Sequence, residues 1–293
     1  MVEKRTAGDH IFDTFNVLLL SLFSILFLYP MVHVVMASFS EPRQIMNHVG
    51  ILLWPDGFSL EGYKVVLGNP NILNGYLNTI FYVVAGTALN ILLSSMGAYV
   101  LSSKEFPMKR TISIAIVFTM YFSGGMIPNF LLVRGLGMYN SRLAMLLPAA
   151  INTWNLIMMR TSFAAIPDSL AESARIDGAN DFTILFRIIF PVAKATIAVM
   201  VLFYAVGHWN SWFNAMIYLQ DREKYPLQLI LREILISNSS SGNTVEAADE
   251  ITNFLGQLIK YCTIVVSTLP VLCIYPFVQK YFMTGVMVGA IKE

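Results

Sequence analysis

Long apolar stretches constrain this chain more than any other feature of its sequence. A helix needs about 20 apolar residues to cross the hydrocarbon core of a membrane, and six stretches are long enough. They cover residues 12–39, 75–103, 111–133, 143–163, 195–219 and 254–281. The composition agrees, because 56% of the 293 residues are hydrophobic, 13% are charged and the mean hydropathy is +0.63. We therefore predict an all-α, polytopic membrane protein with six transmembrane helices.

The start of the chain has the charge pattern of a signal peptide but not its length. Lys4 and Arg5 precede the first apolar stretch, which is far longer than the core of about 7 to 15 residues in a signal peptide. No small-residue cleavage pattern follows it. We predict that this stretch is retained as the first span and leads into an external loop up to residue 74.

Several spans contain residues that interrupt helices. The run Phe122-Ser-Gly-Gly-Met-Ile-Pro128 predicts a break in the third span, which a membrane tolerates only where protein or a cavity covers the freed backbone groups. Pro148 interrupts the fourth span, and Pro270 and Pro276 lie in the sixth.

Charge sets the predicted orientation. Six spans place both ends of the chain on one side, and that side carries eleven of the 19 Lys and Arg residues, against eight on the other. Because cytoplasmic loops carry the excess of Lys and Arg, we predict that both termini and the segment 167–191 are cytoplasmic. The net charge of +1 gives no support for a nucleic-acid partner.

The polar segment 167–191, between the fourth and fifth spans, is more structured than a connection requires. Asp168 and Ser169 are expected to cap a first helix, Gly178 to end it, and Asn180 or Asp181 to cap a second one. This order predicts a helix, a turn and another helix.

The same segment resembles the coupling loop of permease subunits in bacterial ATP-binding-cassette (ABC) importers. Their pattern is E-A-A, three residues, G, nine residues, I-x-L-P, and this chain has Glu172-Ser-Ala, three residues, Gly178, nine residues and Ile188-Ile-Phe-Pro191. Ser and Phe replace Ala and Leu at two positions, and both replacements leave the helix-turn-helix plan intact. The resemblance covers the whole chain and is strongest to the maltose-type carbohydrate permeases, with a permease core at 75–283 and a short cytoplasmic tail at 284–293.

The resemblance implies which residues meet the ATPase subunits. In the coupling loop, Glu172 is the expected polar contact, and Leu170 and Ala174, four residues apart, form an expected apolar face. The implied coupling residues are Leu170, Glu172, Ser173, Ala174, Asp177, Gly178, Ile188 and Pro191. The glycine-bearing tail adds Gly285, Gly289 and Lys292.

The resemblance also implies partners. No G-x-x-x-x-G-K-[ST] motif occurs, so the chain cannot hydrolyse ATP alone, and ATP and Mg are expected in two ABC subunits. A homologous second permease subunit and an extracytoplasmic solute-binding protein are implied as well, in the bacterial inner membrane. Residues 220–253 resemble the external loop that reaches into the binding protein; a disordered connector is the alternative, favoured by composition for 237–243.

The substrate implied is a saccharide. The runs 122–128 and Gly135-Leu-Gly-Met-Tyr139 are similar to the branch that includes the lipoprotein-associated sugar permeases and the alginate importer. Alginate is the preferred substrate, although no basic cluster in the spans indicates a polyanion.

Polar residues at membrane depth are candidates for the substrate pathway, because amides bind sugar hydroxyls and aromatic rings stack on sugars. In a continuous fifth helix, Asn210 and Asn214 share one face, while His208 and Trp212 share another. Hydrogen bonds that hold the helices together are the alternative role for each, and we interpret His208 as a packed residue. The candidates are Asn152, Trp154, Asn155, Asn210 and Asn214.

Two other classes remain open. An ion-coupled secondary transporter of sugars is expected to bury a charged coupling residue, which these spans lack. An intramembrane enzyme is expected to carry a motif such as H-E-x-x-H or G-x-S-x-G, and neither occurs. Cys262 and Cys273, eleven residues apart on one predicted helix, cannot form a disulfide bond.

Overall fold

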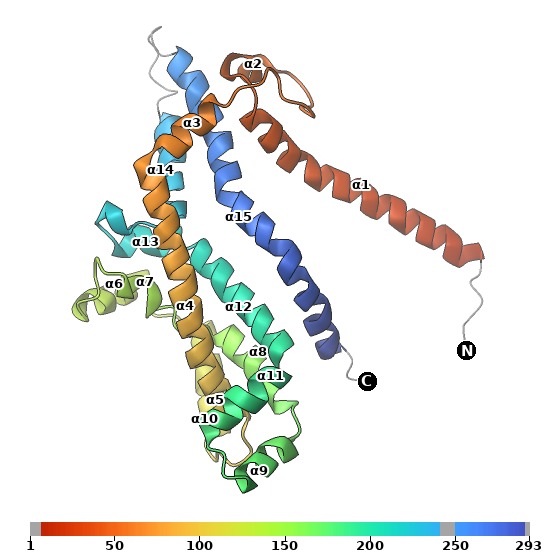
Figure 1. Ribbon diagram of the computed structural model, residues 1–293, viewed down its shortest axis with the longest axis vertical. Coiled ribbons are helices and arrows are strands. Elements are labelled where there is room, and N and C mark those ends of the chain that lie inside the picture. The colour runs from red at the N-terminus through yellow and green to blue at the C-terminus, as the bar shows by residue number, and fades with distance from the viewer. Residues whose placement is uncertain (1–6, 241–249, 291–293) are drawn as a thin grey trace. The chain divides into compact units, whose positions relative to one another are not determined.

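The computed structural model describes residues 7–240 and 250–290, whose regular structure is helical throughout (Figure 1), as predicted. Contacts divide the chain into two units. The first contains Met1–Asn69 and Glu233–Leu269, and the second contains Pro70–Arg232 and Pro270–Glu293.

The first unit is built on the span α1 (Ala7–Ser38), with α2 (Pro42–Asn47), α3 (Glu61–Gly68) and the first part of α15 (Glu250–Ala290). The Ser38 hydroxyl bonds the Tyr63 hydroxyl at 2.7 Å, and Cys262 Sγ contacts the Ser38 carbonyl at 3.4 Å. Both cysteines are free thiols, as expected. The apolar side chains of α1 are exposed along its length, which suits a lipid-facing helix.

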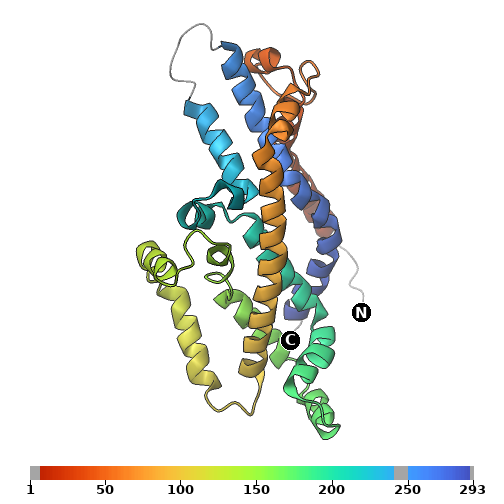
Figure 2. The same cartoon turned by 60° about the vertical axis from the view of Figure 1, so that its left-hand side comes forward.

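The second unit is organised around α4 (Pro70–Ser102), which packs against α8 (Thr153–Ala164) and α12 (Lys194–Trp209) (Figures 1 and 2). Small residues let the three helices approach closely. Between them, the Ser94 and Tyr204 hydroxyls bond at 2.7 Å. Helix α4 begins at Pro70, five residues before the predicted start, because proline suits the first turn of a helix.

Shorter elements complete the second unit. They are α5 (Lys109–Tyr121), α6 (Met126–Gly135), α7 (Leu143–Leu146), α13 (Trp212–Tyr218), the 3₁₀-helix η2 (Arg222–Lys224) and α14 (Leu227–Ser240), which continues beyond the unit.

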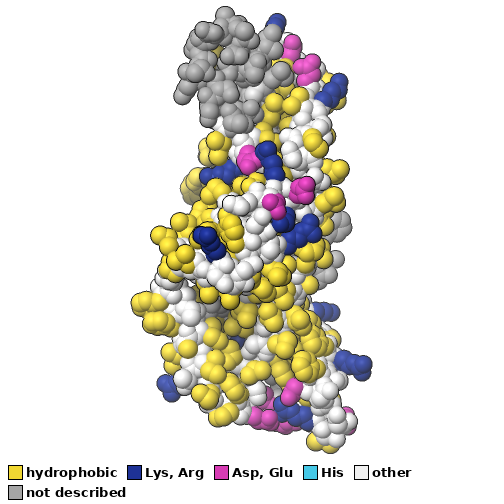
Figure 3. Space-filling view, turned by 90° about the vertical axis from the view of Figure 1, so that its left-hand side faces the viewer, with side chains coloured by type: hydrophobic (Ala, Val, Ile, Leu, Met, Phe, Trp, Pro, Cys, Tyr) yellow, Lys and Arg dark blue, Asp and Glu magenta, His cyan; other side chains and the backbone are white. Residues whose placement is uncertain are grey.

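The prediction of six simple spans is not confirmed. Among the described residues, three helical segments are long and apolar enough to cross a membrane: Gly8–Ser38, Pro70–Ser102 and Gly256–Pro276. Two bent pairs raise the number to five at most. The predicted fourth span consists of α7, a non-helical stretch containing Pro148, and α8, whose 12 residues are too few to cross alone. Apolar side chains still cover much of the face in Figure 3, with charged ones in separate groups.

The predicted break in the third span is confirmed. Gly125 has φ +86 and ψ 175, and the axes of α5 and α6 differ by 114° across it. The prediction of a continuous fifth span was wrong, because α12 ends at Trp209 and α13 begins at Trp212. The faces predicted for Asn210, Asn214, His208 and Trp212 therefore do not apply.

The sixth span and the tail form one element. Helix α15 extends to Ala290 although Pro270 and Pro276 lie inside it. Gly285 and Gly289 are therefore helical residues, and Lys292 lies outside the described residues.

Candidate functional site

The segment 167–191 forms the predicted helix, turn and second helical stretch. Helix α9 (Asp168–Ile176) is followed by its C-cap residue Asp177 and then by Gly178, whose φ of +83 suits glycine. The Gly178 amide donates to the Arg175 carbonyl at 3.0 Å and the Ala179 amide to the Ala174 carbonyl at 2.9 Å. Asn180 Oδ1 then accepts from the Thr183 amide at 2.8 Å, so Asn180 and not Asp181 caps the next helix, α10 (Asp181–Thr183).

The start of α9 differs from the expectation. Its N-cap position is Pro167, and no side chain caps it, so the capping roles expected for Asp168 and Ser169 were wrong. Asp168 is already the first helical residue, and its carboxylate pairs with the Lys104 ammonium. That hydrogen bond and the carboxylate charge raise the pKa of Lys104.

Helix α9 has one buried side and one exposed side. Ala171 and Ala174 pack on the core between α4, α8 and α12, and Ala174 is only 9% exposed. At 100° per residue, Glu172, Ser173 and Ile176 lie on the opposite side, and Ile176 is 86% exposed. Leu170 and Ala174 were expected to form one apolar face for the partner. Ala174 is instead buried against the core and is not available to a partner.

A π-helix follows α10. The segment η1 (Ile184–Ile189) buries Ile184, Leu185 and Ile189 in the same core, and α11 (Phe190–Val192) links it to α12. Of the two motif residues here, Ile188 packs against this core and Pro191 is exposed. The axis turns by 92° between this stretch and α12, so the loop lies across the end of the helix bundle.

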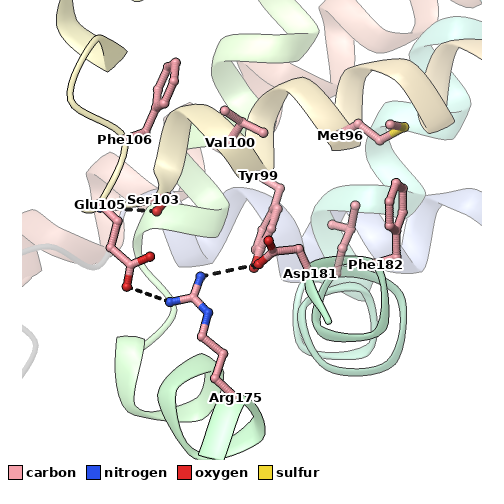
Figure 4. A pocket seen from close by; sticks show the side chains of 10 residues that line it. Met96, Tyr99, Val100, Ser103, Glu105, Phe106, Arg175, Asp181 and Phe182 are labelled. Carbon is pink, nitrogen blue, oxygen red and sulfur yellow. Dashed lines mark hydrogen bonds and ion pairs between the residues drawn. The ribbon is translucent and has the colours of Figure 1, made fainter. Parts of the chain in front are cut away.

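The turn between α4 and α5 contacts the loop through charged side chains that sequence reasoning missed. Arg175 Nη1 donates to Glu105 Oε1 at 2.7 Å, and Nη2 lies 3.4 Å from Asp181 Oδ1, which also accepts from the Tyr99 hydroxyl at 3.0 Å. These residues border a cavity of about 420 Å³ (Figure 4). Glu105 and Arg175 are 70 positions apart, so no local spacing predicts the pair.

The candidate pathway residues are not brought together. Asn152 Oδ1 caps α8 by accepting from the Asn155 amide at 3.1 Å, and Asn210 Nδ2 donates to the Val206 carbonyl at 3.1 Å. Asn155 is buried and Trp154 is 57% exposed. Among the five, only Asn214 lines the cavity of about 520 Å³ between α6, α13 and the non-helical stretch after α7.

Two other polar residues hold the bundle together. Asn90 Nδ2 donates to the carbonyls of Ala149 and Ala150 at 2.6 and 2.8 Å, and Asn90 Oδ1 lies 2.6 Å from His208 Nε2. His208 is 5% exposed, which agrees with its interpretation as a packed residue.

The beginning of the 220–253 loop is anchored and is not a disordered connector. Tyr82 donates to the Lys224 carbonyl at 2.8 Å, and Thr79 Oγ1 accepts from the Leu227 amide at 2.8 Å. Asn140, with φ 56, accepts from the amides of residues 220 and 221 at 3.0 Å. Residues 237–240 continue α14, so the alternative of a disordered connector, favoured by composition for 237–243, is wrong for these four residues, and 241–249 lie outside the described residues.

Comparison with known proteins gives close full-length relatives, although no family model matches. The polygalacturonan/rhamnogalacturonan transport system permease protein YtcP of Bacillus subtilis (strain 168) is 40% identical over 284 residues, 97% of this chain and 99% of YtcP. Protein LplC of the same organism is 36% identical over 98% of this chain and 97% of LplC.

Solved structures agree. The crystal structure of a bacterial ABC transporter involved in the import of the acidic polysaccharide alginate contains a chain with a TM-score of 0.86 and 35% identity, covering 96% of this chain and 100% of that one. A chain in an alginate ABC transporter complexed with a periplasmic protein has a TM-score of 0.55 at 16% identity, over 91% and 92% of the two chains, and supports the fold alone.

Long apolar helices, broken spans and a loop helix packed on α4, α8 and α12 are the features of a polytopic membrane protein. The chain belongs to the permease proteins of ABC sugar transporters. It is therefore a transport subunit that works within a larger complex and is not itself an enzyme. This family membership excludes the two alternatives, an ion-coupled secondary transporter and an intramembrane enzyme.

Proposed function

We propose that this chain is a permease subunit of an importer for an acidic oligo- or polysaccharide, alginate or a related polyuronate. The observation that carries the proposal is the full-length match, at 35% identity, to a chain of the alginate transporter. The relative at 40% identity is named for polygalacturonan, which is also a polyuronate. The substrate class thus rests on two relatives with similar chemistry.

The proposed complex contains a second, homologous permease subunit, two ABC subunits that bind ATP and Mg, and an extracytoplasmic solute-binding protein. The absence of a phosphate-binding motif from this sequence supports the placement of ATP in partner subunits. Both termini and the segment 167–191 face the cytoplasm in this proposal, as the Lys and Arg distribution favours.

In this arrangement α9 is the coupling helix, and its exposed side docks in an ABC subunit. Glu172 supplies charge and Ile176, almost fully exposed on a soluble loop, supplies an apolar anchor. Leu170, Ser173 and Asp177 lie at the edge of this surface. Ala174 and Ile188 contribute by packing the loop on the bundle, and Gly178 and Pro191 by setting its turns.

The helical tail is the second proposed contact with the ABC subunits. Gly285 and Gly289 are four residues apart on α15 and so share one side of the helix, where the lack of side chains permits close approach. Lys292 follows as a cation at the end of the chain.

Substrate identity is tested by ATP hydrolysis of the complex reconstituted in proteoliposomes with its binding protein. We expect oligoalginate or oligogalacturonate to stimulate hydrolysis severalfold, and a neutral glucan of equal length to have no effect. Stimulation by the neutral glucan alone would overturn the substrate class.

Docking is tested with Glu172→Lys and Ile176→Asp. Loss of an anchor residue at an interface costs about 2 kcal/mol or more, which is at least about thirtyfold in affinity. We expect both variants to lose copurifying ABC subunits and saccharide-stimulated hydrolysis. Met108→Asp is the matched control, because Met108 is 57% exposed on the neighbouring turn but not on α9. Unchanged uptake in both variants would exclude the docking role.

A further inference from the structure

The turn that joins α4 to α5 is bonded to α9 at both ends of that helix. Lys104 pairs with Asp168, the first residue of α9, and Glu105 pairs with Arg175, the last but one. Consecutive residues of opposite charge thus reach two residues of opposite charge that are seven positions apart. Seven residues are about two helical turns, so both contacts lie on the same side of α9.

The charges stand in the order that suits the helix. An acid at the N-terminal end and a base at the C-terminal end both complement the helix dipole, and the turn presents the matching cation and anion to them. A single ion pair would leave α9 able to pivot about one point, whereas two pairs at its ends fix the direction of its axis relative to the turn.

The contact continues into α4 itself. Arg175 also reaches Asp181, which accepts from Tyr99 on α4 at 3.0 Å (Figure 4). Arg160 of α8 donates to the Leu101 carbonyl near the end of α4 at 3.3 Å. The cytoplasmic end of α4 in the proposed orientation is therefore joined to the loop by side chains, although the two are more than 60 positions apart in the chain.

The ion pairs of Lys104 with Asp168 and of Glu105 with Arg175 add little to the free energy of folding. The Lys104 and Asp168 side chains are 80% and 48% exposed, and those of Arg175 and Glu105 are 35% and 71% exposed. Ion pairs in contact with water contribute little to folding, because water screens them and the side chains lose freedom. Their geometry matters instead, because the peptide chain connects α9 directly only to α8 and to the helices that follow it.

We propose that Lys104 and Glu105 are positioning residues that clamp the coupling helix to α4, so that movement of α9 reaches α4 as well as the spans adjoining it in sequence. This inference rests on the proposed coupling function of α9. It assigns a part in transport to a turn that lies outside the coupling motif and in which no coupling residue was expected.

Double-mutant cycles in the reconstituted complex test the clamp. We expect Glu105→Gln to lower saccharide uptake per ATP hydrolysed by up to about fivefold, the upper limit that the loss of one exposed ion pair represents. Copurification of the ABC subunits is expected to remain unchanged, because neither Lys104 nor Glu105 is on α9. In the Arg175→Gln background, Glu105→Gln should have no further effect, since its partner is already absent.

The second cycle combines Lys104→Gln with Asp168→Asn and should be non-additive in the same way. Arg110→Glu is the control, because the exposed side chain of Arg110 makes no ion pair or hydrogen bond with the described residues, and its uptake per ATP should equal that of the wild type. Additive effects in both cycles, or an unchanged ratio in both single variants, would overturn the clamp. A wild-type complex that shows no saccharide-stimulated hydrolysis would instead contradict the proposed function.

Discussion

At the scale of single residues, buried polar side chains in the second unit bond one another and the backbone. Asn90 satisfies two carbonyls at the break between α7 and α8 and also orients His208. His208 occupies the space that a side chain at position 86 would need, which is why Gly86 lies opposite it. An unpaired carbonyl or imidazole at this depth would be costly, so these contacts hold α4, α8 and α12 in place.

Gly86→Ala tests this packing. A Cβ at position 86 would overlap His208 Nε2, and overpacking of this kind costs about 1 to 3 kcal/mol. We expect a lower thermal unfolding midpoint in detergent. Gly207→Ala on α12 has no atom within 4 Å of its new Cβ and should leave the midpoint unchanged or raise it. Equal midpoints for the two variants would argue against the close contact.

Local chemistry made some residues predictable from the sequence. Gly178 and Gly125 were placed correctly because a positive φ at a helix end is a property of a few neighbouring residues. Lys104 and Glu105 were not recognised as partners of the loop, because an ion pair across more than 60 positions leaves no spacing to read. Asn152 and Asn210 bond backbone groups at helix ends. Their roles were not predicted, because an apolar composition does not show where a helix breaks.

At the scale of elements, the broken spans have identifiable causes. Past Trp209, Ser211 Oγ donates to the His208 carbonyl at 2.7 Å and Asn210 Nδ2 to the Val206 carbonyl at 3.1 Å. These side chains satisfy carbonyls at the end of α12, so the backbone is free to turn. The apolar pattern is similar on both sides of Asn210, which is why the sequence predicted one continuous helix.

The α5–α6 break depends on one backbone conformation. Gly125 has φ +86 and ψ 175, and a side chain there would meet no atom within 4 Å, so Gly125→Ala introduces backbone strain alone. Such strain costs about 1 to 3 kcal/mol. We expect a lower unfolding midpoint and reduced uptake.

Gly124→Ala is the matched control, because position 124 has no positive φ and its nearest contact, Pro128 Cβ, is at an ordinary 3.8 Å. If both variants transport equally well, the bend does not require this conformation.

At the scale of the whole molecule, the proposed orientation has a direct test. Single cysteines at Glu223 and Met108, both exposed, lie in the loop after α13 and in the turn after α4. In a background with Cys262→Ala and Cys273→Ala, we expect a membrane-impermeant maleimide to label Glu223→Cys in intact cells. Met108→Cys should react only after the membrane is opened. The reverse pattern would invert the topology.

Helix α4 has 33 residues, which makes it about 50 Å long, whereas the hydrocarbon core is about 30 Å thick. Part of it must stand clear of the lipid tails. One end carries the turn that contacts α9, and Asn78, Thr79 and Tyr82, in the half of α4 nearer Pro70, hold the backbone of residues 223–227. Because α4 is one continuous helix, a tilt of about 10° around its midpoint in the bilayer would move its two ends by about 4 Å in opposite directions. One rigid element can thus carry a mechanical signal across the whole membrane without any change in its own hydrogen bonds.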